Sequence, residues 1–351
     1  MKRKSEISVF QIVVVFVGTI IGAGFASGQE IYQFFGRFQG NGLLGLAVAG
    51  LLFMVLTYKI MSLGYRLKIV SYSDIIKSME FVPGIKLLDG IIAFFLFGTF
   101  VVMLSGTGAL LREQWNLPFL YGNIIMALLT TLTILRGLDG IVKANAVIVP
   151  FLMVGIFVLC IISGLDAQIL HEGNGLKRII PKLLDLGWLL SSIIYVAYNI
   201  LLATPILLVL GEKASSDKTL RKASFFGGLL IILIASGIYG VILLHGDAIA
   251  ERGIEVPMAY IASRIGFGFK IMYVILLLLG IYTTAVSSFY GFAQQFGLMD
   301  GVLNSKSILL IMGGVAILFS MIGFSNLIKY LYTLEGYVGI LFLYILLTFK
   351  G

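Results

Sequence analysis

The first apolar stretch of the chain carries glycines and a carboxylate where a plain membrane helix would hold neither. Four glycines fall close together, at Gly18, Gly22, Gly24 and Gly28. Each weakens a helix by about 1 kcal/mol relative to alanine, and Glu30 follows directly. We therefore predict two half-helices joined by an unwound hinge near residues 22–24, whose freed amides can bind an anion and whose freed carbonyls can bind a cation. The alternative is that the glycines only permit close helix packing.

A second apolar stretch, in the other half of the chain, shows a comparable interruption. Asn199 lies in its middle beside Tyr195 and Tyr198. Pro205 removes a backbone hydrogen bond and crowds the carbonyl one turn earlier. We predict a break in this helix too, and the alternative is a proline kink without a site. Two interrupted helices at matching places in two halves are typical of a central transport site.

Hydroxyl groups gather in a third apolar stretch, at Thr283, Thr284, Ser287 and Ser288. Hydroxyls combined with a few carbonyls suit a monovalent cation such as sodium. The alternative is that each hydroxyl bonds back to a carbonyl of its own helix, which is common in membrane helices.

Two carboxylates, Glu30 and Glu335, are surrounded by apolar sequence. A charge at membrane depth is costly, and such a residue is a candidate functional group by default. Each can bind a cationic group, gate a pathway or carry a proton. The alternative is a structural hydrogen bond or ion pair between helices.

About ten membrane-spanning helices are needed to position these residues. Of 351 residues, 59% are hydrophobic and 12% are charged, whereas a soluble domain carries about 25% charged residues. A span needs about 20 apolar residues. The predicted segments are 7–35, 42–65, 87–111, 119–135, 140–164, 184–210, 223–245, 267–291, 306–323 and 326–349.

The segments divide into two halves of five, 7–164 and 184–349, within a single transmembrane domain over residues 1–351. An odd number of spans gives the second half inverted topology. The larger share of the 25 Lys and Arg residues falls on the side of the N-terminus, so both termini are predicted to be cytoplasmic. Residues 247–264 predict either a short helix over a mouth of the protein or an ordinary solvated loop.

Composition also limits the classes of function that the chain can have. The net charge of +8 is interpreted as a topology signal and as lipid-headgroup contacts, not as a nucleic-acid surface. The single cysteine, Cys160, cannot form a disulfide within the chain. With two histidines beside it, the chain has too few such residues for a Cys/His metal cluster. No nucleotide-binding loop or nucleophile triad is evident. We expect no enzyme and no cofactor; the expected partners are the lipid bilayer and a small-molecule substrate, and the oligomeric state is not predicted.

The run from Gly18 to Glu30 resembles the signature of the YkvI-type bacterial membrane proteins, and the resemblance covers the whole chain. More distantly, the chain resembles the amino acid–polyamine–organocation superfamily and the neurotransmitter:sodium symporters. The resemblance implies a LeuT-like fold, an all-α membrane protein of two inverted five-helix repeats in which helices one and six are discontinuous at the substrate. It also implies the bacterial cytoplasmic membrane as the location.

In sodium-coupled members of that superfamily, a sodium ion lies between helices one and eight. The resemblance implies these ligands here: the carbonyls of Gly18, Ile21 and Gly280 and the hydroxyls of Thr283 and Thr284. Proton-coupled members can replace this sodium with a lysine of helix five. The corresponding position in this chain is Leu152, which weakens a lysine mechanism.

The resemblance also implies a substrate site. In the amino acid transporters the substrate carboxylate meets helix-one amides, which here belong to Gly22, Ala23, Gly24 and Phe25. The opposite side is implied to be lined by Tyr195, Tyr198, Asn199, Gly98 and Thr99. Glu30 departs from the gate chemistry of the sodium symporters and favours a cationic or zwitterionic substrate. Aromatic rings can also enclose a quaternary amine.

We therefore predict a secondary active transporter of a small amino acid or amine that works by alternating access with sodium. Segments one and six are expected to hinge against a scaffold of segments three, four, eight and nine. One alternative is a proton-coupled transporter that uses Glu30 or Glu335. A second is a membrane ligand sensor, similar to germinant-receptor subunits. A third is an ion channel, for which no filter motif is evident.

Overall fold

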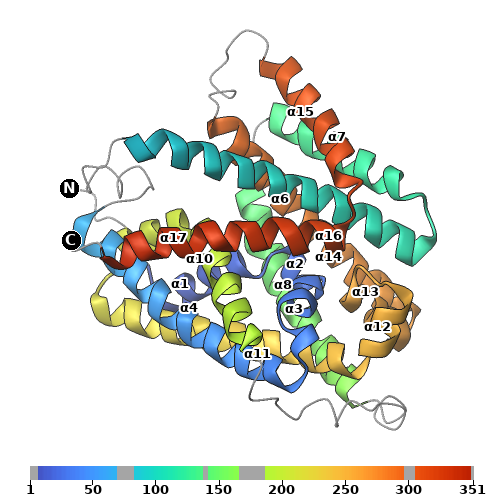
Figure 1. Ribbon diagram of the computed structural model, residues 1–351, viewed down its shortest axis with the longest axis horizontal. Helices are drawn as coiled ribbons and strands as arrows, with labels where there is room; N and C mark the ends of the chain where they lie inside the picture. The colour runs from blue at the N-terminus through green and yellow to red at the C-terminus, as the bar shows by residue number, and fades with distance from the viewer. Residues whose placement is uncertain (1–6, 69–82, 137–140, 166–185, 296–304, 349–351) are drawn as a thin grey trace.

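A computed structural model gives the architecture of the chain and describes residues 7–68, 83–136, 141–165, 186–295 and 305–348 (Figure 1). Regular structure in these ranges is helical, apart from one bridged pair, Ile7 with Ala214. The helices before residue 186 are α1 (Val9–Ile20), α2 (Ala23–Ala26), α3 (Gln29–Phe34), the 3-10 turn η1 (Gly36–Phe38), α4 (Gly40–Leu67), α6 (Pro83–Trp115), α7 (Phe119–Arg136) and α8 (Ile141–Gly164). Those after it are α10 (Gly187–Lys213), α11 (Asp217–Leu244), α12 (Gly246–Arg252), α13 (Pro257–Ile265), α14 (Phe267–Gln295), α15 (Ser305–Ser320), α16 (Phe324–Leu327), the π-helical segment η3 (Ile328–Tyr332) and α17 (Thr333–Thr348).

Helices occupy all ten predicted segments. In the part of the chain that the structure describes, six helices are long and apolar enough to cross a membrane: Gly40–Leu67, Gly90–Trp115, Gly187–Lys213, Asp217–Leu244, Phe267–Gln294 and Phe324–Leu347. Four shorter apolar helices cover the other segments: Val9–Ile20, Phe119–Leu135, Ile148–Gly164 and Lys306–Ser320. The prediction of an all-helical chain is confirmed.

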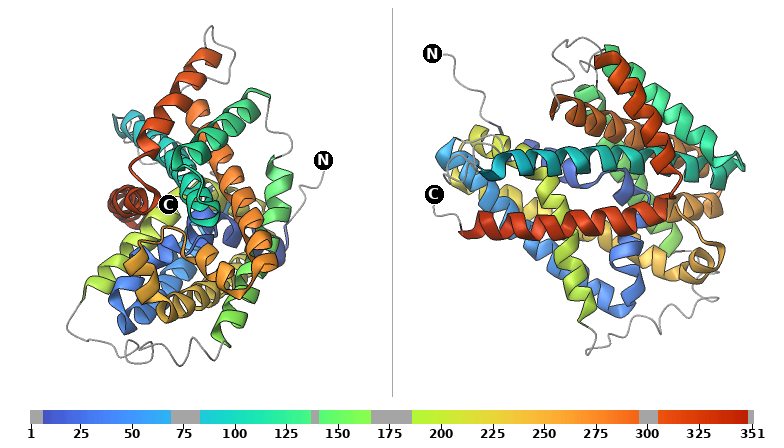
Figure 2. Two further views of the ribbon diagram at one scale, coloured as in Figure 1. Left: turned by 90° about the vertical axis from the view of Figure 1, so that its right-hand side faces the viewer. Right: turned by 45° about the horizontal axis from the view of Figure 1, so that its top comes forward.

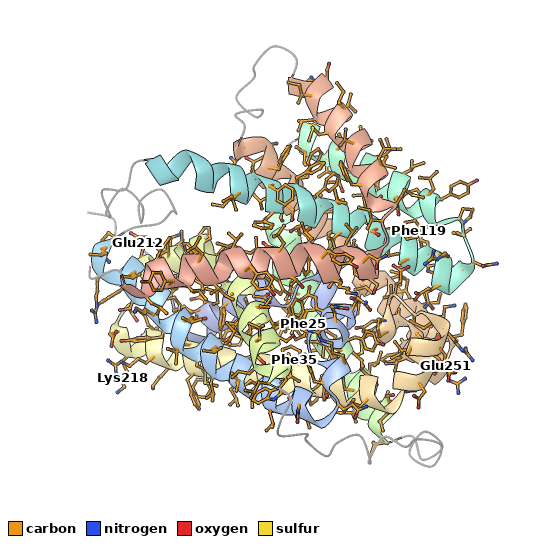
Figure 3. All side chains as sticks on the ribbon, in the orientation of Figure 1. Phe25, Phe35, Phe119, Glu212, Lys218 and Glu251 are labelled. Atoms are coloured by element: carbon orange, nitrogen blue, oxygen red, sulfur yellow. The ribbon has the colours of Figure 1, made fainter. Side chains whose placement is uncertain are left out.

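The surface has the polarity of a membrane protein. Large apolar side chains are exposed along the sides of the helices, among them Leu128, Phe151, Leu233, Leu318 and Leu341. Soluble proteins rarely expose apolar surface of this extent. Figure 3 shows the charged residues Glu212 and Lys218 at one end, Glu251 at the other, and the apolar Phe25 and Phe35 between them. The chain is therefore a multi-pass membrane protein.

The helices pack in two groups. The helices α1, α4, α10 and α11 pack on one another, and so do α6, α7, α14 and α15. Figure 2 shows α15 lying along α7 in the second group. α8 contacts members of both groups, and α17 packs against α10. The second group consists of the segments predicted to form a scaffold.

The end of the molecule opposite the start of α1 is covered by α12 and α13 (Figure 1). Of the two alternatives considered for residues 247–264, the structure shows the helical one, in two short helices joined by a linker. Pro257 occupies the first turn of α13, where its missing amide hydrogen costs nothing. The next amide, of Met258, donates to the carbonyl of Ser27 at 3.0 Å. This helix is therefore attached to the junction between α2 and α3.

The predicted discontinuity of the sixth segment is wrong. α10 runs without interruption from Gly187 to Lys213, through both Asn199 and Pro205. The amide of Asn199 donates to the carbonyl of Tyr195 at 2.9 Å, and Thr204 donates to Ile200 at 2.7 Å. Polar side chains in this stretch therefore bond to carbonyls of their own helix. Close packing of α10 against α4 and α17 supports the helix where proline removes a bond.

Candidate functional site

The first helix is broken, as predicted. Ser8 and Gln11 form a reciprocal capping box that starts α1 at Val9. The helix ends twelve residues later, a length of about 18 Å at 1.5 Å per residue. That is little more than half of a hydrocarbon core of about 30 Å. Ile21 (ψ 72°) and Gly22 (ψ −174°) then leave the helical conformation before α2 begins.

The break leaves backbone groups without partners at this depth. Among the described residues, no hydrogen bond satisfies the amides of Ala23, Gly24 and Phe25 or the carbonyls of Gly18, Thr19 and Ile21. Broken backbone of this kind is tolerated in a membrane only where it is buried in protein or lines a cavity. Three of the four predicted anion-binding amides and two of the predicted sodium-binding carbonyls therefore have free hydrogen-bonding capacity. The fourth amide, of Gly22, donates to the carbonyl of Ile20 at 2.9 Å.

A second turn folds the chain back over α2. Gly28 has φ 79°, a left-handed conformation that glycine adopts without steric cost. A Cβ there would also lie 2.7 Å from Cγ of Met258. The turn brings Glu30 of α3 against α2, where a Cβ at Gly24 would overlap with its Oε1. Both glycines therefore allow the carboxyl group of Glu30 to lie against α2: Gly28 permits the turn, and Gly24 leaves space for Oε1.

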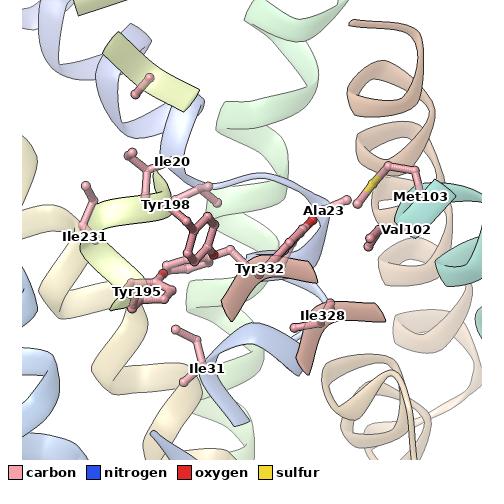
Figure 4. Packing of buried hydrophobic residues seen from close by; sticks show 14 of the residues in the cluster. Ile20, Ala23, Ile31, Val102, Met103, Tyr195, Tyr198, Ile231, Ile328 and Tyr332 are labelled. Atoms are coloured by element: carbon pink, nitrogen blue, oxygen red, sulfur yellow. The ribbon is translucent and has the colours of Figure 1, made fainter. Parts of the chain in front are cut away.

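The carboxyl group of Glu30 lies in an aromatic enclosure. Its side chain is buried, and Tyr198 of α10 donates a hydrogen bond to Oε2. The Tyr198 ring stacks on Tyr332 at 5.0 Å between centroids and on Phe34 at 5.6 Å. Tyr195 packs against Phe34 at 5.4 Å. Figure 4 shows Tyr332 and Tyr198 meeting beside Ala23 at the break. A carboxylate among four aromatic rings is suited to a cationic ammonium group.

Glu335 is the second buried carboxyl group of this region. It is 0% exposed, and neither of its oxygens has a hydrogen-bond partner among the described residues. Glu335 lies in the first turn of α17, directly after η3, which carries Tyr332 and contacts α3, the helix of Glu30. The structure thus brings together Glu30, Tyr195, Tyr198 and Glu335, which sequence reasoning selected separately.

Sequence reasoning did not assign a role to Tyr332. This residue ends η3, a π-helical segment between α16 and α17. Such segments are rare and are often found at functional sites. The available signal was the position of Tyr332 three residues before Glu335 in an otherwise apolar helix.

Other predicted substrate residues lie around this enclosure or point away from it. A Cβ at Gly98 of α6 would lie 2.6 Å from the Leu331 side chain in η3. The hydroxyl of Thr99 is buried and has no hydrogen-bond partner among the described residues. The Asn199 amide, in contrast, is bonded within α10.

The predicted sodium ligands are not brought together by the described contacts. The hydroxyls of Thr283 and Thr284 both donate to the carbonyl of Gly280, at 3.0 and 2.9 Å. This is the bonding within one helix that was considered as the alternative. A Cβ on Gly280 would lie 3.3 Å from Leu152 of α8, so an apolar side chain lies beside this carbonyl.

A network of an ion pair and hydrogen bonds around Glu255 holds segments together at the end of the molecule where α13 lies. Sequence reasoning did not predict this network. Glu255 lies in the α12–α13 linker and pairs with Arg112 of α6 at 2.6 Å. Its Oε2 accepts the amides of Phe324 and Ser325 at 2.7 and 3.3 Å, at the start of α16. Its own amide donates to Glu113 at 2.5 Å. One carboxylate therefore joins three segments that are distant in sequence.

An open pocket of about 410 Å³ lies over this network. Its lining includes Arg112, Glu255 and Ser325. The hydroxyl of Ser325 accepts a hydrogen bond of 2.7 Å from Gln29, the residue before Glu30. The contact between Gln29 and Ser325 therefore links the lining of the pocket to the helix that carries Glu30.

The architecture is shared with solved secondary transporters. The manganese transporter of Eremococcus coleocola aligns with a TM-score of 0.60 and 14% identity, over 97% of this chain and 78% of that one. The inward-facing conformation of Mhp1 aligns with a TM-score of 0.60 and 15% identity, over 96% and 75%. A sodium-coupled sialic acid symporter, in a substrate-bound outward-open state, gives 0.60 and 12% over the same shares. The fold is thus that of the LeuT-fold transporters.

Two curated proteins of Bacillus subtilis (strain 168) identify the family. The chain is 31% identical to the uncharacterized membrane protein YkvI over 350 residues, which cover 99% of this chain and 98% of that protein. It is 27% identical to the uncharacterized protein YyaD over 334 residues, 95% and 94% of the two chains. No protein-family model matches. The chain belongs to the YkvI family of membrane proteins.

Proposed function

We propose that this protein is a secondary active transporter that moves a small amino acid or amine by alternating access. The substrate's ammonium group binds the carboxylate of Glu30 within the rings of Phe34, Tyr195, Tyr198 and Tyr332. The free amides that follow Gly22 bind a substrate carboxylate when there is one. In this proposal the protein lies in the bacterial cytoplasmic membrane with both termini inside, and its halves, 7–164 and 184–349, are inverted repeats.

The proposal rests on the environment of the buried Glu30 carboxyl group. Its carboxyl group is buried beside a broken helix and receives one hydrogen bond, from Tyr198. No Arg, Lys or His forms an ion pair with it among the described residues. A buried carboxylate without a positively charged partner is costly. An ammonium group supplies both the missing charge and the missing hydrogen-bond donors.

Ligand-induced thermal stabilisation tests the proposal. The purified full chain is heated with a panel of amino acids, primary amines and tetramethylammonium, each in sodium and in potassium. A ligand that binds only the folded state raises the apparent melting temperature by mass action. The wild type should respond to one chemical class, and Glu30→Gln should lose the response. Glu251→Gln, an exposed change on α12, should retain it. Absence of any response in folded wild type would count against the proposal.

We also propose sodium as the coupling ion, held by Gly18, Ile21, Gly280, Thr283 and Thr284. The unpartnered carbonyls of α1 support this assignment, although both hydroxyls are bonded to Gly280. Sodium binding would require the hydroxyl oxygens to turn towards α1. Replacing both threonines with alanine should raise the sodium concentration needed for ligand binding at least several-fold. Unchanged sodium dependence in a folded double variant would reject the site.

A sensor is the second candidate, because detection of a ligand needs the same enclosed site. Counterflow in lipid vesicles separates the two functions. A transporter exchanges external labelled ligand for unlabelled ligand trapped inside, whereas a sensor binds the ligand without exchanging it.

A further inference from the structure

Glu335 has no described bonding partner to explain its burial. It is enclosed completely, and both carboxyl oxygens are unpaired. Buried polar atoms in native proteins are almost always hydrogen-bonded, so two such atoms on one side chain require an explanation. The proposed ammonium site at Glu30 does not use this second carboxyl group.

The packing around Glu335 leaves little space for a bulky ligand. Its neighbour Gly336 lies so close to α10 that an added Cβ would be 2.7 Å from the carbonyl oxygen of Ile194. One turn further on, a Cβ at Gly339 would be 2.5 Å from the carbonyl oxygen of Ala197. Separations under 3 Å are essentially never seen for real Cβ atoms. α17 and α10 are therefore in backbone contact here.

The groups that face Glu335 include acids but no described base. The segment η3, which runs directly into α17, carries Tyr332, and α3, which contacts η3, carries Glu30. The tyrosines of α10, Tyr195 and Tyr198, lie around Glu30. A cation on a neighbouring helix, Lys59 of α4, bonds to the carbonyl of Leu347 at the far end of α17. Two coupled carboxyl groups without a base cannot both be ionised at low cost.

From this arrangement we infer that Glu335 is a proton-binding site of the transport cycle, an inference that rests on the proposed function. A proton neutralises the carboxylate without needing the space that an amine or a hydrated metal ion would need. It stays on Glu335 while α17 is packed on α10. When the helices separate, the O–H bond breaks and the proton passes to water, and it forms again with a proton from water. No electrons are exchanged. Glu30 takes the ammonium group and Glu335 takes the proton.

Infrared difference spectroscopy of the full chain tests the inference without a known substrate. The C=O stretch of a protonated carboxyl group disappears when the group ionises. The titration starts at about pH 6, where carboxyl groups in contact with water are already ionised because their ordinary pKa is about 4. We expect the wild-type film to lose this signal in more than one component as pH is raised from there. Glu335→Gln should lack one component, Glu30→Gln should lack another, and Glu251→Gln should match the wild type.

Two results would overturn the inference. One is a Glu335→Gln spectrum identical to that of the wild type. The other is a Glu335 component that stays protonated across the whole pH range in which the protein is folded, because that group would be merely structural. If Glu335→Gln does not fold, Glu335→Asp retains a titrating carboxyl group, and its component should shift in frequency; no shift would also reject the site.

The proposed ammonium site at Glu30 can be rejected without rejecting the proton site at Glu335. Glu30→Gln should lose stabilisation by amines and still show the Glu335 component. A wild type that shows the titrating component of Glu335 but binds none of the amines and amino acids would contradict the proposed function and keep the proton site.

Discussion

Around Glu30, three residues have complementary tasks. Gly28 turns the chain back, Gly24 leaves room for the returning carboxyl group, and Tyr198 donates to it. A buried polar group that loses its partner costs about 1–3 kcal/mol. The site is therefore sensitive to changes of a single carbon or a single hydroxyl.

Replacement of Gly24 with alanine tests the fit between the break and the carboxyl group. The new Cβ would overlap with Oε1 of Glu30, and overpacking of this kind typically costs about 1–3 kcal/mol. We expect a lower apparent melting temperature and loss of amine stabilisation. Gly22→Ala is the matched control, because an added Cβ there meets no atom within 4 Å among the described residues. Equal behaviour of the two variants would contradict the role given to Gly24.

The residues of the site could be selected from the sequence only where a local pattern marked them. The glycines marked the break, and apolar surroundings marked Glu30 and Glu335. Tyr332 was marked only by its position three residues before Glu335, because a tyrosine in an apolar helix is otherwise ordinary. The Glu255 network was not predictable, since its partners are more than sixty residues apart in the chain and their meeting depends on tertiary packing.

At the scale of the helix, the two segments that were predicted to be interrupted behave differently. Four glycines lower the helical propensity of the first segment, and this segment is broken. In α10 one proline removes one hydrogen bond, and the helix persists because it packs closely on α4 and α17. The sequence predicts where a helix is weakened. Whether it breaks is decided by the packing around it.

The contact between α17 and α10 can be tested by a change of one glycine. Gly336→Ala would force α17 away from Ile194 and should lower the apparent melting temperature, at a cost of about 1–3 kcal/mol. Gly314→Ala is the control, because the added Cβ on α15 meets no atom within 4 Å among the described residues. It should be neutral or slightly stabilising. A neutral Gly336→Ala would show that α17 is not tightly held.

At the scale of the whole molecule, Glu255 connects α6, a member of one packing group, to the start of α16, which leads into α17 and so to α10 of the other group. In the proposed alternating access, this junction would have to open. Hydrogen bonds to a charged group contribute about 1.5–3 kcal/mol each. The network is therefore strong enough to hold one end of the protein closed.

Hydrogen exchange measures the strength of this junction. Glu255→Gln removes the charge that holds Arg112 and the amides of Phe324 and Ser325. We expect these two amides to exchange about ten-fold faster or more, which corresponds to about 1.4 kcal/mol. Glu251→Gln should leave their exchange unchanged. Unaltered exchange in Glu255→Gln would mean that the linker does not hold α16.

The pairing of two buried acids without a described base has an electrical consequence. A unit charge that crosses a membrane potential of 100 mV gains or loses about 2.3 kcal/mol. When Glu30 carries an ammonium group or a proton, and Glu335 carries a proton, this pair of carboxyl groups is neutral. As long as both keep these partners, the voltage across the membrane does no work on the two carboxyl groups when the helices move.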